Sequence, residues 1–157
     1  MIEDGLDLHH SKPRLHLTLP LPPTDNHIYT TLRGRRGRIL TAEAKSYKTL
    51  VASRVADLAA HSSIQLRTDV PYAISISAYF PVIENVNWSK GITRSRYRKV
   101  DTQNRQKLLV DGLMTAIGVD DSHLFHIRKL KFVDPNDPRV EITLVELDED
   151  WARAFGQ

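Results

Sequence analysis

Alternating apolar and polar positions predict four strands along the chain. Residues 15–19 and 72–80 alternate most clearly, the second as a run of Ile and Ser residues between aromatic ones. An alternation with a period of two is typical of a strand that buries one face. Two more strands are predicted at residues 124–133 and 139–147, because the segment between them, DPNDP, is rich in turn-forming residues.

Apolar residues spaced three and four apart predict a first helix. Tyr47, Val51 and Val55 recur at this spacing and share one helical face. Thr41 precedes them and is a suitable N-cap, since its hydroxyl oxygen can accept a hydrogen bond from a free backbone N–H of the first turn. We therefore expect an amphipathic helix over residues 41–61.

A second helix and a short hairpin complete the predicted elements. The helix is expected over residues 101–117, with Gly118 as its C-cap. Residues 27–32 and 38–40 are expected to pair as a hairpin around a glycine-containing loop. Residues 81–100 read as a long polar loop, and loops of that length inside a small domain are usually functional or disordered.

These elements predict a single α+β domain. We expect a small mixed, mostly antiparallel sheet with two helices packed on one of its faces. Residues 1–14 are expected to form an N-terminal tail, residues 15–147 the domain, and residues 148–157 a C-terminal tail. No internal repeat or interdomain linker is evident.

Composition narrows the class of protein. The chain has 157 residues, of which 41% are hydrophobic and none is cysteine, so disulfides, thiolate metal sites and cysteine nucleophiles are excluded. The acidic N-terminus lacks the apolar core of a signal peptide, and no apolar run is long enough to span a membrane. A cytoplasmic protein without membrane association is expected.

Charge is unevenly distributed. The net charge is +3, from 22 Lys and Arg against 19 Asp and Glu, but residues 33–38 read RGRRGR and residues 90–99 carry five positive charges and no negative one. Acidic residues gather at the termini and over residues 101–121. Arginine-rich loops can simply be solvated, yet two of them around an acidic cluster suit a metal-dependent enzyme that acts on a polyanion. The residues expected to hold phosphates are Arg33, Arg35, Arg36, Arg38, Lys90, Arg94, Arg96, Arg98 and Lys99.

The acidic cluster contains candidate metal ligands. Asp101 begins the second helix, and Asp120 and Asp121 follow its C-cap. Mg²⁺ prefers oxygen ligands and usually takes one or two protein carboxylates together with water and phosphate oxygens. Lys107 shares a helical face with Gln103 and is placed to stabilise charge on a cleaved phosphate. Taken singly, each residue also has an ordinary explanation as a cap, a polar turn or a surface lysine.

The length of the second helix places the candidate ligands Asp101 and Asp121 far apart within one chain. Residues 101–117 would span about 24 Å at 1.5 Å per residue. Asp121 can therefore meet Asp101 in two ways: by returning along the following strand, or by coming from a second subunit. The sequence leaves both alternatives open.

Three ordered motifs resemble the RusA family of Holliday-junction resolvases. LPLPPTDNHIY at residues 19–29 is similar to that family's L-P-x-P-P-S-x-N-x-x-Y, and LTAEAKSY at residues 40–47 is similar to the entry into its first helix. DTQNRQKLLVDGL at residues 101–113 and VDD at residues 119–121 resemble D-x-D-N-x-x-K-x-x-x-D-A-L followed by D-D-x-Q-V. The resemblance extends over about residues 15–147.

The resemblance implies a homodimer that cuts paired strands of four-way DNA junctions with Mg²⁺, or with Mn²⁺ as a substitute ion. It assigns catalytic roles to Asp101, Asp121 and Lys107, and we expect Asp120 as a further metal ligand. Gln103 stands where the family has a second Asp; its carbonyl oxygen can approach a metal but brings no negative charge. The alternative is therefore a non-catalytic relative that binds junctions through an impaired metal site. Two residues of the first motif, Asn26 and Tyr29, are also expected to contact DNA.

Overall fold

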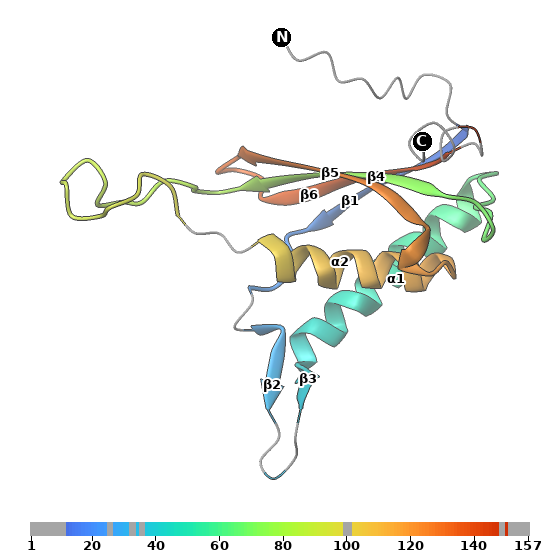
Figure 1. The fold of residues 1–157 in the computed structure, drawn as a ribbon, viewed down its shortest axis with the longest axis horizontal. Coiled ribbons are helices and arrows are strands. Elements are labelled where there is room, and N and C mark those ends of the chain that lie inside the picture. The colour runs from blue at the N-terminus through green and yellow to red at the C-terminus, as the bar shows by residue number, and fades with distance from the viewer. Residues whose placement is uncertain are drawn as a thin grey trace.

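The structure is a computed structural model that describes residues 12–24, 27–31, 34, 37–98, 102–147 and 150. Figure 1 shows two layers, a sheet and a pair of helices, with two projections that leave the body in different directions. The elements are β1 (Lys12–Pro20), β2 (Tyr29–Thr31), β3 (Arg38–Leu40), α1 (Ala42–His61), β4 (Tyr72–Phe80), α2 (Thr102–Ile117), the 3₁₀ turn η3 (Asp121–His123), β5 (Leu124–Val133) and β6 (Arg139–Glu146).

The main sheet confirms the predicted fold class. Its four strands follow the order β1-β6-β4-β5. β6 pairs antiparallel with both β1 and β4, whereas β4 and β5 pair in parallel. The parallel pair requires a crossover, which α2 supplies. The result is a mixed, mostly antiparallel sheet.

The last two strands do not form a hairpin, although the predicted turn between them is present. β4 lies between β5 and β6 in the sheet, so the turn passes across the end of β4, and Asp134 N–H donates to the carbonyl of Phe80 over 2.9 Å. Arg139 fixes the far side of the turn through ion pairs with Asp134 at 2.7 Å and Glu141 at 2.8 Å.

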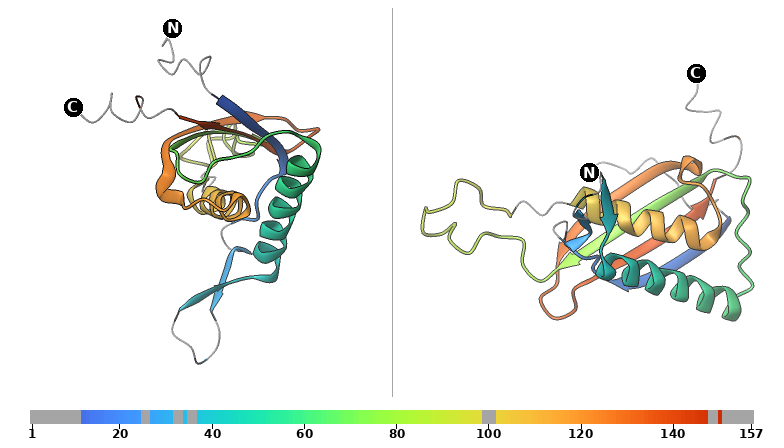
Figure 2. Two further views of the ribbon diagram at one scale, coloured as in Figure 1. Left: turned by 90° about the vertical axis from the view of Figure 1, so that its right-hand side faces the viewer. Right: turned by 90° about the horizontal axis from the view of Figure 1, so that it is seen from below.

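Both helices pack on one face of the sheet, as Figure 2 shows. Leu17, Ile74 and Ile142 project from three neighbouring strands into a buried core, which Val51 of α1 and Leu113 of α2 complete. Each of these side chains is almost fully removed from water, and such burial is the main favourable contribution to folding. The core fixes the position of α2 against the sheet.

The first helix begins as the sequence predicts. Thr41 is its N-cap, and the Thr41 hydroxyl accepts a hydrogen bond from Ala44 N–H over 3.1 Å. The same hydroxyl donates to the carbonyl of His27, and Thr41 N–H donates to the carbonyl of Ile28 over 2.9 Å. These bonds tie the base of the β2–β3 hairpin to the start of α1. No helix in the described part of the chain has the length and apolar character needed to cross a membrane.

Candidate active site and nucleic-acid interface

The N-terminal end of α2 lies at the corner between the two projections (Figures 1 and 2). The helix begins at Thr102, and Lys107 is exposed near its second turn. Asp101 falls outside the described residues, and the side chain of Gln103 is not described. Their predicted roles as metal ligands therefore stay predictions.

The C-terminal end of α2 stops at Gly118, as predicted. Gly118 has a φ of +74°, in the left-handed region that glycine adopts without strain. Its N–H donates to the carbonyl of Thr115 over 3.2 Å, and Val119 N–H donates to the carbonyl of Met114 over 3.0 Å. This pair of bonds is the Schellman motif, which satisfies carbonyls that a helix end leaves free. Val119 is buried, so the chain is held firmly where it turns toward the two aspartates.

Asp120 and Asp121 differ in what they do at this end. Asp120 caps η3, and its carboxylate accepts a hydrogen bond from Ser122 N–H over 2.9 Å. Hydrogen bonding to Ser122 lowers the pKa of Asp120, so this carboxylate is ionised at neutral pH. Asp121 is the first residue of η3 and is exposed. The structure therefore gives Asp120 a local structural role and leaves the Asp121 carboxylate accessible from solvent.

The structure does not bring Asp121 back to the start of α2. Thr102, which follows Asp101 in the chain, opens a helix of 16 residues, about 24 Å long. Asp121 follows the other end of that helix, and β5 begins only at Leu124. A return of Asp121 along the next strand is therefore excluded.

The first projection is the β2–β3 hairpin. β2 and β3 pair antiparallel over three residues each, with Tyr29 opposite Leu40 and Thr31 opposite Arg38. Arg38 is exposed, while Tyr29 is half-buried against the core. The Arg38 side chain is therefore accessible to a phosphate, whereas part of the Tyr29 side chain packs against the core. Four of the predicted contacts, Asn26, Arg33, Arg35 and Arg36, lie outside the described residues.

The second projection is formed by residues 81–98, which we call the arm. The sequence predicts a loop here, but the structure adds an antiparallel bridge between Glu84 and Tyr97. The predicted phosphate contacts Lys90, Arg94, Arg96 and Arg98 are all exposed on it. Arg96 is paired with Glu84 at 2.8 Å, so part of its charge is neutralised. Lys99 lies outside the described residues.

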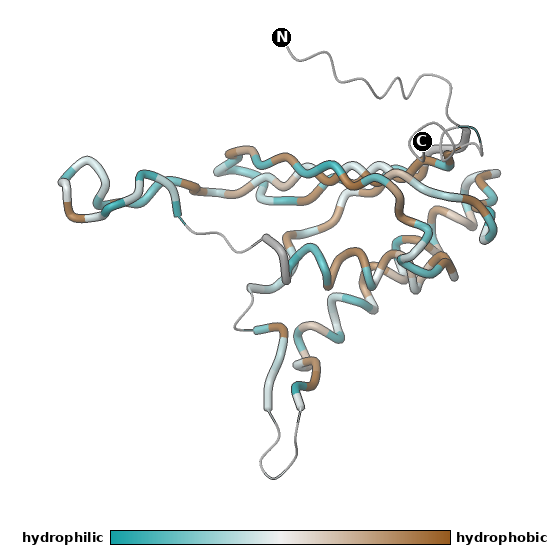
Figure 3. The backbone as a smooth tube through the Cα atoms, viewed as in Figure 1, coloured by the Kyte–Doolittle hydropathy of each residue, from teal (hydrophilic) through white to brown (hydrophobic). Residues whose placement is uncertain are grey.

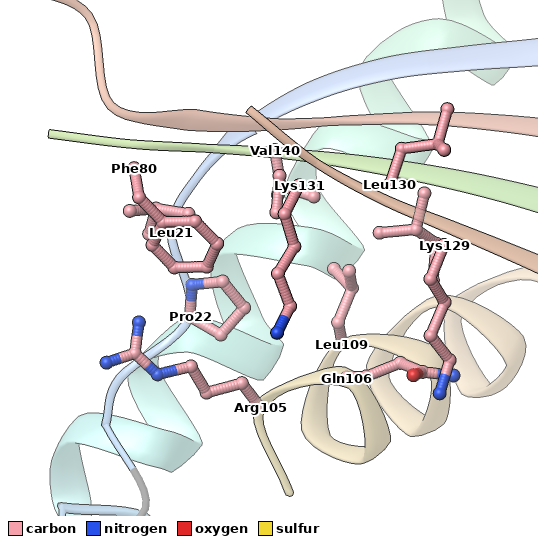
Figure 4. A pocket seen from close by; sticks show the side chains of 12 residues that line it. Leu21, Pro22, Phe80, Arg105, Gln106, Leu109, Lys129, Leu130, Lys131 and Val140 are labelled. Atoms are coloured by element: carbon pink, nitrogen blue, oxygen red, sulfur yellow. The ribbon is translucent and has the colours of Figure 1, made fainter. Parts of the chain in front are cut away.

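A small cavity with a basic rim opens beside the start of α2. Its volume is about 50 Å³, which is room for only a few water molecules. Figure 4 shows Lys129 and Lys131 extending from β5 toward α2, with Arg105 and Pro22 on the opposite side. The Arg105 guanidinium lies 5.9 Å from the ring centre of Phe80, within the range of a cation–π interaction. The cavity therefore adds positive charge to the end of α2 that lies between the two projections.

These basic residues were missed from the sequence. Lys129 and Lys131 stand opposite Ile76 and Ala78 in the sheet register, so they continue a row that faces the helices. Both lysines are exposed, so they reach solvent at the rim of the cavity from positions where the neighbouring strand β4 carries apolar residues. The Oε1 atom of Gln106, which lines the same cavity, is buried without a hydrogen-bond partner.

No group of three acidic or histidine side chains in the described part of the chain is arranged to hold a metal ion. Asp120 and Asp121 contribute carboxylates at one end of α2, while the other predicted ligands precede or occupy its first turn. The described residues therefore place exposed cations on the two projections and beside the start of α2, and an exposed acidic turn beyond the other end of that helix, about one helix length away.

Comparison with known proteins identifies the family. The family model described as Endodeoxyribonuclease RusA matches residues 20–145. The chain belongs to the RusA family of endodeoxyribonucleases. Its relatives include a crossover junction endodeoxyribonuclease of Enterobacteria phage 82, 27% identical over 136 residues, which make up 86% of this chain and 97% of that relative.

Bacterial relatives give the same result. The crossover junction endodeoxyribonuclease RusA of Escherichia coli (strain K12) is 26% identical over 135 residues, which cover 85% of this chain and 96% of the relative. The protein of the same name from Shigella sonnei (strain Ss046) is 25% identical over the same shares of the two chains. These similarities extend over nearly the whole length of each relative.

Proposed function

We propose that this protein is a Mg²⁺-dependent endonuclease that cuts four-way DNA junctions. The observation that carries the proposal is membership of the RusA family over residues 20–145, together with relatives that are named crossover junction endodeoxyribonucleases. The exposed cations of the arm and of Arg38 support it, because phosphate contacts dominate the affinity of proteins for DNA.

The proposed metal ligands are Asp101 and Asp121, with Gln103 as a neutral oxygen donor and Asp120 as a further carboxylate. Mg²⁺ holds its ligands at about 2.0–2.1 Å in a near-octahedral shell. Two groups at opposite ends of a 16-residue helix are about 24 Å apart, so they cannot contact one ion. The ligands of one chain are therefore incomplete for the predicted site.

A homodimer resolves this difficulty. In a two-fold symmetric dimer with antiparallel α2 helices, Asp121 of a second copy would lie beside the start of α2 in the first. The same symmetry would create a second equivalent site, which suits a substrate that must be cut on two strands. Mg²⁺ bound at each site would polarise the scissile phosphate and activate a water molecule.

Lys107 has a separate role in the proposal. Its side chain is exposed near the start of α2, so its ammonium group is available to a phosphate held beside the metal ligands. A cation at that position would stabilise the negative charge that develops as the phosphodiester bond breaks. The arm and the β2–β3 hairpin would bind the DNA on either side of this point.

Gln103 favours a second candidate function, a junction-binding protein with little or no cleavage. An amide oxygen at this position lowers the negative charge offered to the metal by one, relative to the family's aspartate. Such a protein would keep the basic projections and bind branched DNA without cutting it.

One assay separates the two candidates. A synthetic four-way junction labelled on each strand in turn is incubated with the protein in Mg²⁺, in Mn²⁺ and in EDTA, and a duplex of equal length is the control. Symmetric cuts that require the metal support the nuclease. Tight, salt-sensitive binding of the junction without cuts in either metal supports the binding protein, and equal affinity for junction and duplex removes selectivity for junctions.

A further inference from the structure

The arm ends in apolar side chains that are open to solvent. Val86 is 74% exposed, Ile92 is 69% exposed and Trp88 is 41% exposed. Figure 3 shows apolar and strongly polar stretches side by side at the outer end of this projection. Exposed apolar residues gathered on one projection usually mark an interaction site. We call the segment that carries them, residues 85–92, the arm tip.

The root of the arm is held in a defined shape. Asn85 N–H donates to the carbonyl of Arg96 over 2.8 Å, and Arg98 N–H donates to the carbonyl of Ile83 over 2.8 Å. The side-chain amide of Asn85 also donates to the carbonyl of Ser95 over 2.7 Å. These bonds join the two halves of the arm, so the tip is presented from a structured base.

The arm tip is a series of turns that backbone hydrogen bonds join. Trp88 N–H donates to the carbonyl of Asn85, and Gly91 N–H donates to the carbonyl of Trp88, each over 3.0 Å. Gly91 has a φ of +67°, a conformation that side-chain-bearing residues rarely adopt. Ile92 N–H then donates to the carbonyl of Asn87 over 3.3 Å. A preformed tip loses less conformational entropy on binding than a flexible loop would.

Charge indicates the kind of partner. Residues 81–98 contain four Lys and Arg residues and one Glu, a net charge of 4 − 1 = +3. Glu84 is paired with Arg96, while Lys90 lies within the tip and Arg94 beside it. Apolar side chains interleaved with cations suit a polyanion that also exposes apolar ring faces. Nucleic acid with unstacked bases has both properties.

We propose that the arm tip inserts against unstacked bases at the branch point of the DNA, with Trp88 stacking on a base and Lys90 and Arg94 holding adjacent phosphates. Strands exchange between helical arms at a branch point, so a protein that opens the junction can reach base faces there that a continuous duplex keeps stacked. Apolar side chains that insert between base steps partly unstack them and kink the DNA. This inference rests on the proposed function and assigns the arm tip as the element that distinguishes branched DNA from duplex.

The test uses the full-length protein and compares Trp88→Ser with Val82→Ser. Val82 is a matched control, since it lies in the same arm, outside the tip, and is 46% exposed. Trp88→Phe keeps an aromatic ring at the tip. Binding is measured in Ca²⁺ on a four-way junction that carries 2-aminopurine at its branch point, and on a duplex of equal length. Circular dichroism confirms that each variant is folded.

The inference predicts that Trp88→Ser binds the junction about fivefold to a hundredfold more weakly, the effect expected for the loss of one stacked base. Its affinity for the duplex should be nearly unchanged, and the change in 2-aminopurine fluorescence on binding should be lost. Trp88→Phe should keep most of both signals, and Val82→Ser should behave as the unaltered protein.

Two results would overturn the inference and leave the proposed function intact. One is a Trp88→Ser variant that binds and cuts junctions as well as the unaltered protein, with the same fluorescence change. The other is a variant that becomes monomeric in sedimentation, which would assign the tip to self-association. Failure of the unaltered protein to bind junctions would instead refute the proposed function itself.

Discussion

The two ends of α2 differ in the charged residues that the structure describes near them. The end that starts at Thr102 is surrounded by cations from Arg105, Lys107 and β5, whereas the end at Gly118 leads into Asp120 and Asp121. A helix dipole favours negative groups at its start and positive groups at its end, and the described first turn of α2 has no acid and the last turn no base. Apart from Asp101, which precedes the helix in the sequence, the charged residues near the two ends of α2 therefore do not stabilise its dipole.

The different charges at the two ends of α2 are explained if each end binds a charged partner from outside the chain. Phosphates approaching the start of α2 would meet both the cations and the positive end of the dipole. In the proposed site, the aspartates beyond the other end would come from a second copy, because the helix and its Schellman motif hold them away from its start. Charged residues that do not stabilise the helix they flank are expected at functional sites.

The largest effect is expected from removing the exposed aspartate. Asp121→Asn should reduce junction cleavage below detection while leaving junction binding intact or slightly tighter, because it removes a metal ligand and a negative charge near phosphate. Asp137→Asn is the matched control, since Asp137 is an exposed acid that is paired with Arg139 at 3.4 Å. Cleavage rate and gel-shift affinity are measured on the same junction. Normal cleavage by Asp121→Asn would show that the acidic end takes no part in the chemistry.

A smaller loss of cleavage activity is expected from removing the Lys107 side chain near the start of α2. Lys107→Ala should lower the cleavage rate on the order of a hundredfold, as removal of one group that stabilises transition-state charge typically does. Its effect on junction affinity should be much smaller, because the arm and hairpin still hold the DNA. Lys107→Arg keeps the charge and should retain part of the rate. A variant that loses affinity and rate in equal proportion would identify Lys107 as a DNA contact only.

Gln103→Asp adds an acid near the start of α2. A carboxylate at this position offers Mg²⁺ a charged ligand, so we expect half-saturation at a several-fold lower Mg²⁺ concentration and a cleavage rate that rises or stays level. Gln103→Glu, with the same charge on a longer side chain, tests how strictly geometry matters. An unchanged Mg²⁺ dependence would mean that residue 103 does not approach the metal.

The smallest effect concerns acids that have no functional role in this account. Arg139 hydrogen-bonds to Asp134 and lowers the pKa of that carboxyl. Because the folded pKa is below the unfolded one, the pair stabilises the protein above the ordinary carboxyl pKa of about 4 and loses its contribution as pH falls through the lower folded value. Asp134→Asn should lower the urea midpoint slightly at pH 7, and the difference from the unaltered protein should disappear at acid pH. A difference that is constant with pH would contradict this ion-pair explanation.

Much of the fold could be predicted because its local signals are strong. The alternation of residues 72–80, the Thr41 cap and the Gly118 stop each determine an element from a few neighbouring residues. The position of β4 between β5 and β6 could not be predicted, because a turn signal shows only that the chain reverses and does not show which strands then pair. The bonds that join the two halves of the arm at its root could not be predicted for a related reason, since they connect residues ten or more positions apart without a periodic pattern.

The candidate site could be predicted only in part from the sequence. The acids, Lys107 and the basic segments follow from residue types and motif spacing. The basic rim of the cavity depends on the register between β4 and β5, which places Lys129 and Lys131 toward α2. The separation of the two acidic positions could be calculated from helix length, but whether Asp121 returned along β5 depended on where that strand begins.

Mixing two inactive variants tests the shared site most directly. Asp101→Asn and Asp121→Asn are each expected to be inactive alone. If every site combines Asp101 of one copy with Asp121 of the other, a mixed dimer contains one doubly altered site and one intact site. Mixing under conditions that exchange subunits should then restore Mg²⁺-dependent nicking of a single strand of the four-way junction. If exchange is confirmed by sedimentation or differential tagging and no nicking returns, the two aspartates do not act across the subunits and the account is contradicted.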